Sequence, residues 1–117
     1  VGSFNFERNL AQLSESLGNR QCASMDFLGQ GRTLIDGTLR GSNKETLEQA
    51  ELRFSLDIWA EQLVDYIETQ HKGKKVHLVG NSVGGTIALI ASGRVKERVA
   101  SVALINLAPF WPPDLWG

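Results

Sequence analysis

A serine between two glycines is the residue of this chain best placed to do chemistry. Residues 80–84 read Gly-Asn-Ser-Val-Gly, with Ser82 at the centre. The apolar run 76–79 precedes them, and the small-residue run 86–91 follows. This order predicts a strand, a sharp turn and a helix, with Ser82 at the apex of the turn. Such an arrangement is the nucleophile elbow of hydrolytic enzymes.

The expected chemistry is attack of the Ser82 hydroxyl on an ester carbonyl. Gly80 and Gly84 are expected to let strand and helix pass close together, because neither has a Cβ. The helix after Ser82 would aim its free N–H groups and positive dipole end at the developing oxyanion. The backbone N–H of Val83 is therefore a candidate oxyanion donor. The alternative is that Ser82 is an ordinary N-cap residue after a glycine-rich turn.

A serine nucleophile also needs a base within about 3 Å, and in this elbow the histidine normally follows the serine in the chain. No histidine follows Ser82 in this sequence. His77 lies five residues earlier, roughly 16 Å away along a strand, and is predicted to be a packed or hydrogen-bonded strand residue. His71 is expected to be solvated at a helix end. Asp26 is predicted to cap a turn, with a role as the catalytic acid left open.

Two further polar residues are candidates for the catalytic acid. Asn106 follows a predicted strand, but its amide cannot stabilise an imidazolium as a carboxylate does. Asp114 follows two prolines and could serve only if the tail folded back. Neither residue is therefore expected to complete the site.

The elements expected around Ser82 alternate between helix and strand. They are a helix over 6–17 closed by Gly18, a strand over 21–26, a polar surface insertion over 33–51, a helix from Ser55 to about Gln70 with Trp59, Leu63 and Ile67 buried, the elbow strand and helix, and a strand over 99–106. This alternation predicts the α/β class, with a parallel sheet and helices on both faces. Active sites in such sheets lie at the carboxyl ends of the strands, where Ser82 falls.

Composition narrows the class of protein. The 117 residues carry a net charge of −1 and are enough for one small domain. There is no basic stripe to indicate a nucleic-acid partner, and no apolar run approaches the roughly 20 residues of a membrane helix. Cys22 is the single cysteine, and no cluster has metal-ligand spacing. We therefore expect neither a metal nor another cofactor, and composition leaves the oligomeric state undecided.

Four segments, taken together, carry a more specific likeness. They are Val1–Phe4, the stretch Met-Asp-Phe-Leu-Gly-Gln-Gly at 25–31, the elbow with Gly85, and Leu104–Asn106 with Ala-Pro-Phe-Trp at 108–111. In this order they resemble the pheophytinase branch of the α/β-hydrolases, as does the segment 54–59. The likeness covers most of the chain and is weakest over the insertion.

The resemblance implies a serine-type carboxylic ester hydrolase of the chloroplast that cleaves the phytyl ester of pheophytin or chlorophyll-type pigments. Ser82 would be the nucleophile and Val83 N–H one oxyanion donor. Phe110 and Trp111 would either line a large apolar substrate site or simply close the core. Residues 1–117 would form one partial domain lacking the first strands, the cap and the region with the catalytic acid and histidine. The alternatives are a general carboxylesterase of the same fold or a catalytically inactive binding fragment.

Overall fold

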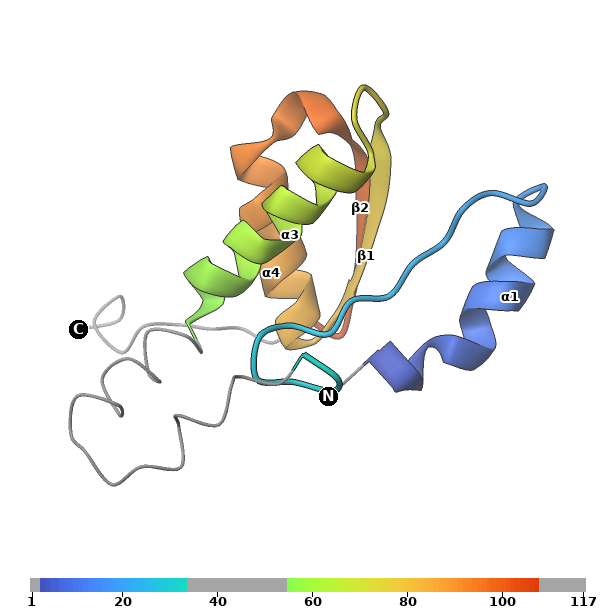
Figure 1. Ribbon diagram of the computed structural model, residues 1–117, viewed down its shortest axis with the longest axis horizontal. Coiled ribbons are helices and arrows are strands. Elements are labelled where there is room, and N and C mark those ends of the chain that lie inside the picture. The colour runs from blue at the N-terminus through green and yellow to red at the C-terminus, as the bar shows by residue number, and fades with distance from the viewer. Residues whose placement is uncertain (1–2, 34–54, 108–117) are drawn as a thin grey trace. The chain divides into compact units, whose positions relative to one another are not determined.

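The computed structural model describes residues 3–33 and 55–107 (Figure 1). They belong to two compact units, residues 1–54 and residues 55–117, and each is described by itself. The first unit contains η1 (Ser3–Asn5) and α1 (Glu7–Ser16), and the second contains α3 (Leu56–Gln70), β1 (Val76–Asn81), α4 (Val83–Arg94), η3 (Lys96–Arg98) and β2 (Val99–Ile105). The predicted insertion, except for Thr33, lies outside the described residues, as do Phe110 and Trp111.

The second unit is built on a parallel pair of strands. β1 and β2 run in register from His77 opposite Ser101 to Asn81 opposite Ile105. The chain between them passes through α4, because parallel neighbours need a crossover connection. The predicted parallel α/β arrangement is therefore confirmed. Parallel pairing also brings the carboxyl ends of β1 and β2 to one edge, where the turn at Ser82 begins.

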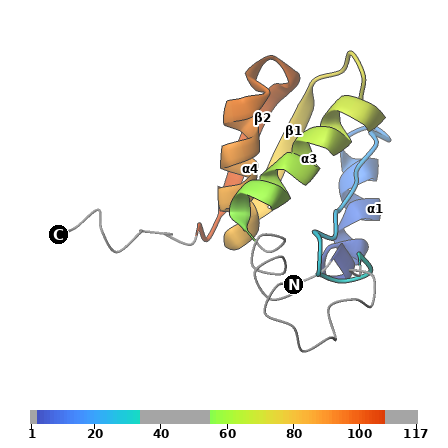
Figure 2. The same cartoon turned by 60° about the vertical axis from the view of Figure 1, so that its left-hand side comes forward.

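Both helices of this unit pack on the same face of the strand pair, whereas the sequence predicted helices on both faces (Figures 1 and 2). Ile67 of α3 and Ala88 of α4 share one buried cluster with Leu78 of β1. Along β1 the burial alternates, because successive side chains point to opposite faces. Val79 and Ile105 point to the other face, where they are 60% and 49% exposed.

α3 begins and ends as its sequence indicates. Ser55 is the N-cap, and its side chain accepts a hydrogen bond from the Ile58 N–H at 3.2 Å. Ile67 of the expected stripe is buried, and Leu63 packs against the same cluster. Trp59 is only half-buried, and its neighbour Ala60 is fully enclosed instead. The smaller residue therefore occupies the tightest part of the interface.

Arg98 ties the end of α3 to the chain that enters β2. Its guanidinium donates to the backbone carbonyl oxygens of His71 and Lys74, and it pairs with Glu68 at 2.8 Å. The last carbonyl groups of a helix have no partner within the helix, so a cation placed there satisfies them and complements the dipole. This contact fixes the end of the strand pair opposite Ser82.

The first unit agrees with one sequence prediction and corrects another. α1 covers the expected helical span, and Gly18 follows it with a positive φ of 72°. The predicted strand over 21–26 is wrong, because the structure assigns no strand there. A strand exists only when a neighbour completes its hydrogen-bond ladder, and the ladder found in the described residues joins β1 to β2.

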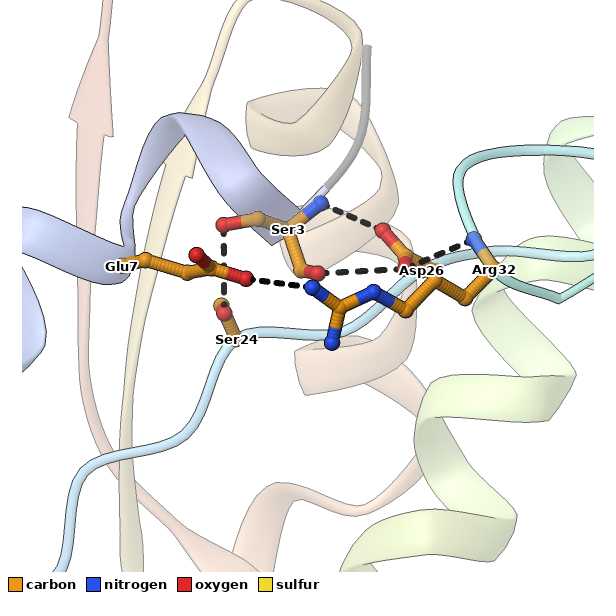
Figure 3. Close-up of polar contacts among 5 residues, drawn as sticks. All are labelled: Ser3, Glu7, Ser24, Asp26 and Arg32. Atoms are coloured by element: carbon orange, nitrogen blue, oxygen red, sulfur yellow. Dashed lines mark hydrogen bonds and ion pairs between the residues drawn. The ribbon is translucent and has the colours of Figure 1, made fainter.

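Asp26 organises the loop that follows this extended segment (Figure 3). Its carboxylate accepts hydrogen bonds from the backbone N–H and hydroxyl of Ser3, and from the Arg32 N–H at 2.9 Å. A Cβ on Gly31 would fall on this carboxylate, so only glycine fits there. Two backbone hydrogen bonds lower the pKa of Asp26. The bond from the Arg32 N–H has the larger effect, and the bond from the Ser3 N–H comes next. The turn-capping role expected for Asp26 is the one that the structure shows.

The hydrogen bonds of Asp26 are expected to depend on pH. Its pKa lies below the ordinary 3.8, so the contribution to stability is complete above pH 3.8 and is lost as the pH falls through the lowered pKa. Asp26→Asn should lose that contribution at neutral pH. The measurement uses the longest natural protein that contains this sequence, called here the parent protein. The amide NMR signals of Ser3 and Arg32 in that protein report whether their hydrogen bonds to Asp26 are formed. Unchanged signals in Asp26→Asn, measured beside a Glu15→Gln control, would contradict the expectation.

Candidate active site at the strand-to-helix turn

The backbone at Ser82 is held in an unusual conformation. Its φ is 53° and its ψ is −123°, which matches the first central residue of a type II′ turn. Glycine dominates that position, because a Cβ is crowded there by the backbone. A non-glycine residue in such a region costs about 1–3 kcal/mol, and such residues cluster at functional sites. Ser82 is therefore strained.

Backbone hydrogen bonds hold this turn between the strand pair and α4. The Ser82 N–H donates to the Ile105 carbonyl oxygen at 2.9 Å, which extends the ladder beyond β1. The Ser82 carbonyl oxygen accepts from the Gly85 N–H, also at 2.9 Å. The residue is thus fixed on both sides, by β2 and by the first turn of α4. The surrounding structure can sustain the strain for this reason.

One of the two glycines expected to permit the close approach is confirmed, and the other is not. A Cβ on Gly80 would lie 2.5 Å from the Gly85 Cα and closer still to the Gly84 carbonyl oxygen. Among the described residues, a Cβ on Gly84 would meet nothing within 4 Å, whereas one on Gly85 would lie 3.2 Å from the Gly80 carbonyl oxygen. The close approach of strand and helix therefore involves Gly80 and Gly85. The role predicted for Gly84 is wrong, because the phase of α4 turns its Cβ position away from β1.

The structure argues against the alternative that Ser82 is an ordinary N-cap residue. A capping serine has an extended backbone and accepts a hydrogen bond through its side chain, as Ser55 does. Ser82 has a positive φ, and its side chain makes no capping hydrogen bond. Val83 is the first residue of α4, so its N–H has no acceptor within the helix. The start of the helix therefore places a donor that the helix itself leaves unused, and its positive dipole end, beside the serine.

Comparison with known proteins places this geometry in a family. The family model described as alpha/beta hydrolase fold matches residues 1–116. The chain belongs to this family. It is also similar to "Pheophytinase, chloroplastic" of Arabidopsis thaliana, with 34% identity over 95% of the chain, and to "Protein PHYLLO, chloroplastic" of the same plant, with 32% identity over 79%.

The chain spans only part of these relatives. The match covers 26% of the pheophytinase and 5% of the PHYLLO protein. No solved structure matches the chain. Within residues 3–33 and 55–107, no helix is long and apolar enough to cross a membrane. The comparisons therefore support an α/β-hydrolase, with resemblance to a chloroplast pheophytinase over about a quarter of that protein.

The two histidines of this α/β-hydrolase chain lie away from the elbow. His77 stands near the start of β1, where its Nδ1 is 2.7 Å from the Ser101 hydroxyl oxygen on β2. This is the cross-strand hydrogen bond expected of a strand histidine. His71 is the C-cap of α3, and its ring stacks edge-on with Tyr66 at 5.4 Å between centroids. Both belong to the end of the second unit opposite Ser82.

Sequence reasoning did not single out Leu107 as part of the site. The structure places its side chain against the first turn of α4, where its Cδ1 would lie 3.0 Å from a Cβ on Gly85. The turn is made at Asn106, which has a positive φ of 46°. Asparagine tolerates this conformation better than most residues, so an Asn directly after a strand is the signal that could have indicated the turn.

The strain at Ser82 leads to a stability prediction. Ser82→Gly and Ser82→Ala both remove the hydroxyl group, but only the glycine variant also removes the Cβ. The glycine variant of the parent protein is expected to be more stable than the alanine variant by about 1 kcal/mol, as relief of strain exceeds the entropic cost of glycine. Urea unfolding of both variants measures the difference. An alanine variant as stable as the glycine variant would show that the turn is not strained.

Proposed function

We propose that this chain carries the nucleophile of a serine-type carboxylic ester hydrolase. The observation that supports the proposal best is the strained conformation of Ser82 at the start of α4. Strain of this kind is sustained by the two hydrogen bonds to Ile105 and Gly85, and it projects the serine away from the strand it follows. An ordinary helix cap needs no such conformation. Membership of the α/β-hydrolase family supports the same assignment.

The proposed reaction runs in two steps. The Ser82 Oγ attacks the ester carbonyl carbon, while a histidine from outside this chain takes the hydroxyl proton and passes it to the leaving alcohol. Val83 N–H donates a hydrogen bond to the carbonyl oxygen as it becomes negative. Water then attacks the acyl-enzyme, which releases the acid and restores the Ser82 hydroxyl. No cofactor or metal is needed for this sequence of steps.

The proposed substrate is a large apolar ester, the phytyl ester of a pheophytin or chlorophyll-type pigment. The proposal rests on the similarity to the protein named pheophytinase, at 34% identity over 95% of this chain. The word "chloroplastic" in the names of both relatives supports a chloroplast location. Phe110 and Trp111, outside the described residues, are proposed to contact the phytyl chain. The second candidate is a general carboxylesterase acting on smaller esters.

A substrate panel tests the proposal on the parent protein. Pheophytin and p-nitrophenyl butyrate are each incubated with the parent protein and with its Ser82→Ala variant. We expect release of phytol from pheophytin by the parent protein alone. Hydrolysis of the butyrate ester without phytol release would favour the general carboxylesterase. A parent protein that is folded yet hydrolyses neither ester would overturn the hydrolase assignment and favour the inactive binding protein.

A further inference from the structure

The segment that follows β2 makes two separate contacts with the elbow. Ile105 accepts the Ser82 N–H at 2.9 Å, and two residues later Leu107 reaches the first turn of α4. The positive φ of Asn106 takes the chain out of the strand direction between these contacts. Residues 105–107 therefore follow the elbow from the Ser82 backbone to the Gly85 backbone.

Leu107 meets α4 in its first turn, directly after the serine. Gly85 is the third residue of α4, and its backbone is tied to that of Ser82. The hydrogen bond from the Gly85 N–H to the Ser82 carbonyl oxygen fixes this relation at 2.9 Å. A side chain in contact with Gly85 therefore lies beside the turn that presents Ser82. It also lies at the carboxyl edge of the strands, where ligands of open parallel sheets bind.

The exposure of Leu107 differs from that of a core residue. Gly85, against which it packs, is buried, but Leu107 itself remains 42% exposed. Part of the side chain thus covers the helix, and the rest is exposed. Apolar side chains that line a site while a few polar groups fix the reacting atoms are the usual construction of small-molecule sites.

We propose that Leu107 is a specificity-determining residue that contacts the apolar chain of the ester. The inference rests on the proposed hydrolase function, and it adds that Leu107 forms an apolar wall of the substrate site beside Ser82. Removal of several methyl and methylene groups from this wall should weaken the binding of long apolar chains in the transition state. A short ester does not reach far enough to lose the contact. Leu107 therefore sets the preference for long esters over short ones.

The test measures kcat/KM of the parent protein for p-nitrophenyl palmitate and p-nitrophenyl acetate. Leu107→Ala and Leu107→Gln should lower the palmitate-to-acetate ratio by about 10-fold, the size expected for a few lost methylene contacts. Leu107→Met keeps volume and apolarity and should leave the ratio within about twofold. The glutamine variant guards against misfolding of the alanine variant, because Leu107 is partly exposed and a polar end group can reach water.

Labelling of Ser82 by a small fluorophosphonate is the control for the elbow itself. A lower ratio with unchanged labelling supports the proposal. An unchanged ratio, or equal losses for both esters together with slower labelling, would overturn it, because Leu107 would then only pack against α4. If the unsubstituted parent protein hydrolyses neither of these two esters nor pheophytin, the hydrolase function itself fails, and the specificity role fails with it. The two failures are therefore distinguishable.

Discussion

Replacing Gly80 with alanine is expected to destabilise the second unit by about 3 kcal/mol or more. The added methyl group would lie 2.5 Å from the Gly85 Cα and closer still to the Gly84 carbonyl oxygen. Both obstacles are backbone atoms, so no side-chain rotation relieves the overlap, and β1 and α4 must move apart. Strain of this kind is among the mechanisms that produce the largest effects of single substitutions. Urea unfolding of the parent protein, followed through tryptophan fluorescence, measures the loss.

Gly84→Ala is the matched control for this prediction. It adds the same methyl group four residues later in the same motif, where no atom of residues 3–33 or 55–107 lies within 4 Å. Alanine is the better helix former, so this variant should be as stable as the original or more stable by up to about 1 kcal/mol. Equal destabilisation by the two substitutions would contradict the account of how strand and helix approach. Greater destabilisation by Gly84→Ala would contradict it more strongly.

Replacing Ser82 with alanine is expected to lower kcat for ester hydrolysis by about 10⁴-fold or more. Loss of a serine nucleophile removes the covalent pathway, and what remains comes from substrate binding and oxyanion stabilisation. Because Ser82 is half-buried and its side chain makes no capping hydrogen bond, the variant should still fold. The rate is measured on whichever ester of the panel the parent protein hydrolyses fastest.

Ser101→Ala is the matched control for this loss of activity. Ser101 is also a serine of the strand pair, but it is exposed and hydrogen-bonded to His77 at the opposite end from Ser82. Its replacement should change kcat by less than about twofold, as is usual for surface substitutions away from a site. A large loss of activity in Ser101→Ala, with Ser82→Ala still active, would transfer the nucleophile assignment to the other end of the strands.

The parts of the fold that sequence predicted well are those with local causes. Ser55 caps α3 through a hydrogen bond to a residue three positions later, and Ile67 follows from helical periodicity. The elbow is similarly local, because its strand, turn and helix are continuous in the chain. The fixed spacing of glycine and serine was therefore enough to locate Ser82 at the apex.

The parts that sequence predicted poorly depend on distant neighbours. Residues 21–26 have strand-like composition, but a ladder requires a partner that composition does not reveal. Which glycine faces β1 depends on the phase of α4, so the motif spacing predicts Gly84 where the structure uses Gly85. Leu107 was missed because its contact with α4 depends on the backbone turn at Asn106. In each case the decisive fact is a relation between two segments.

The most direct test of the central claim is covalent labelling of the folded parent protein with a fluorophosphonate probe, followed by peptide mapping. The account predicts one label per molecule, located on Ser82, and its loss both in Ser82→Ala and after unfolding in urea. Loss on unfolding matters because the reactivity is attributed to the strained turn and the start of α4, which exist only in the folded chain. A folded protein that takes up no label, or takes it up elsewhere, would contradict the claim that Ser82 is an activated nucleophile.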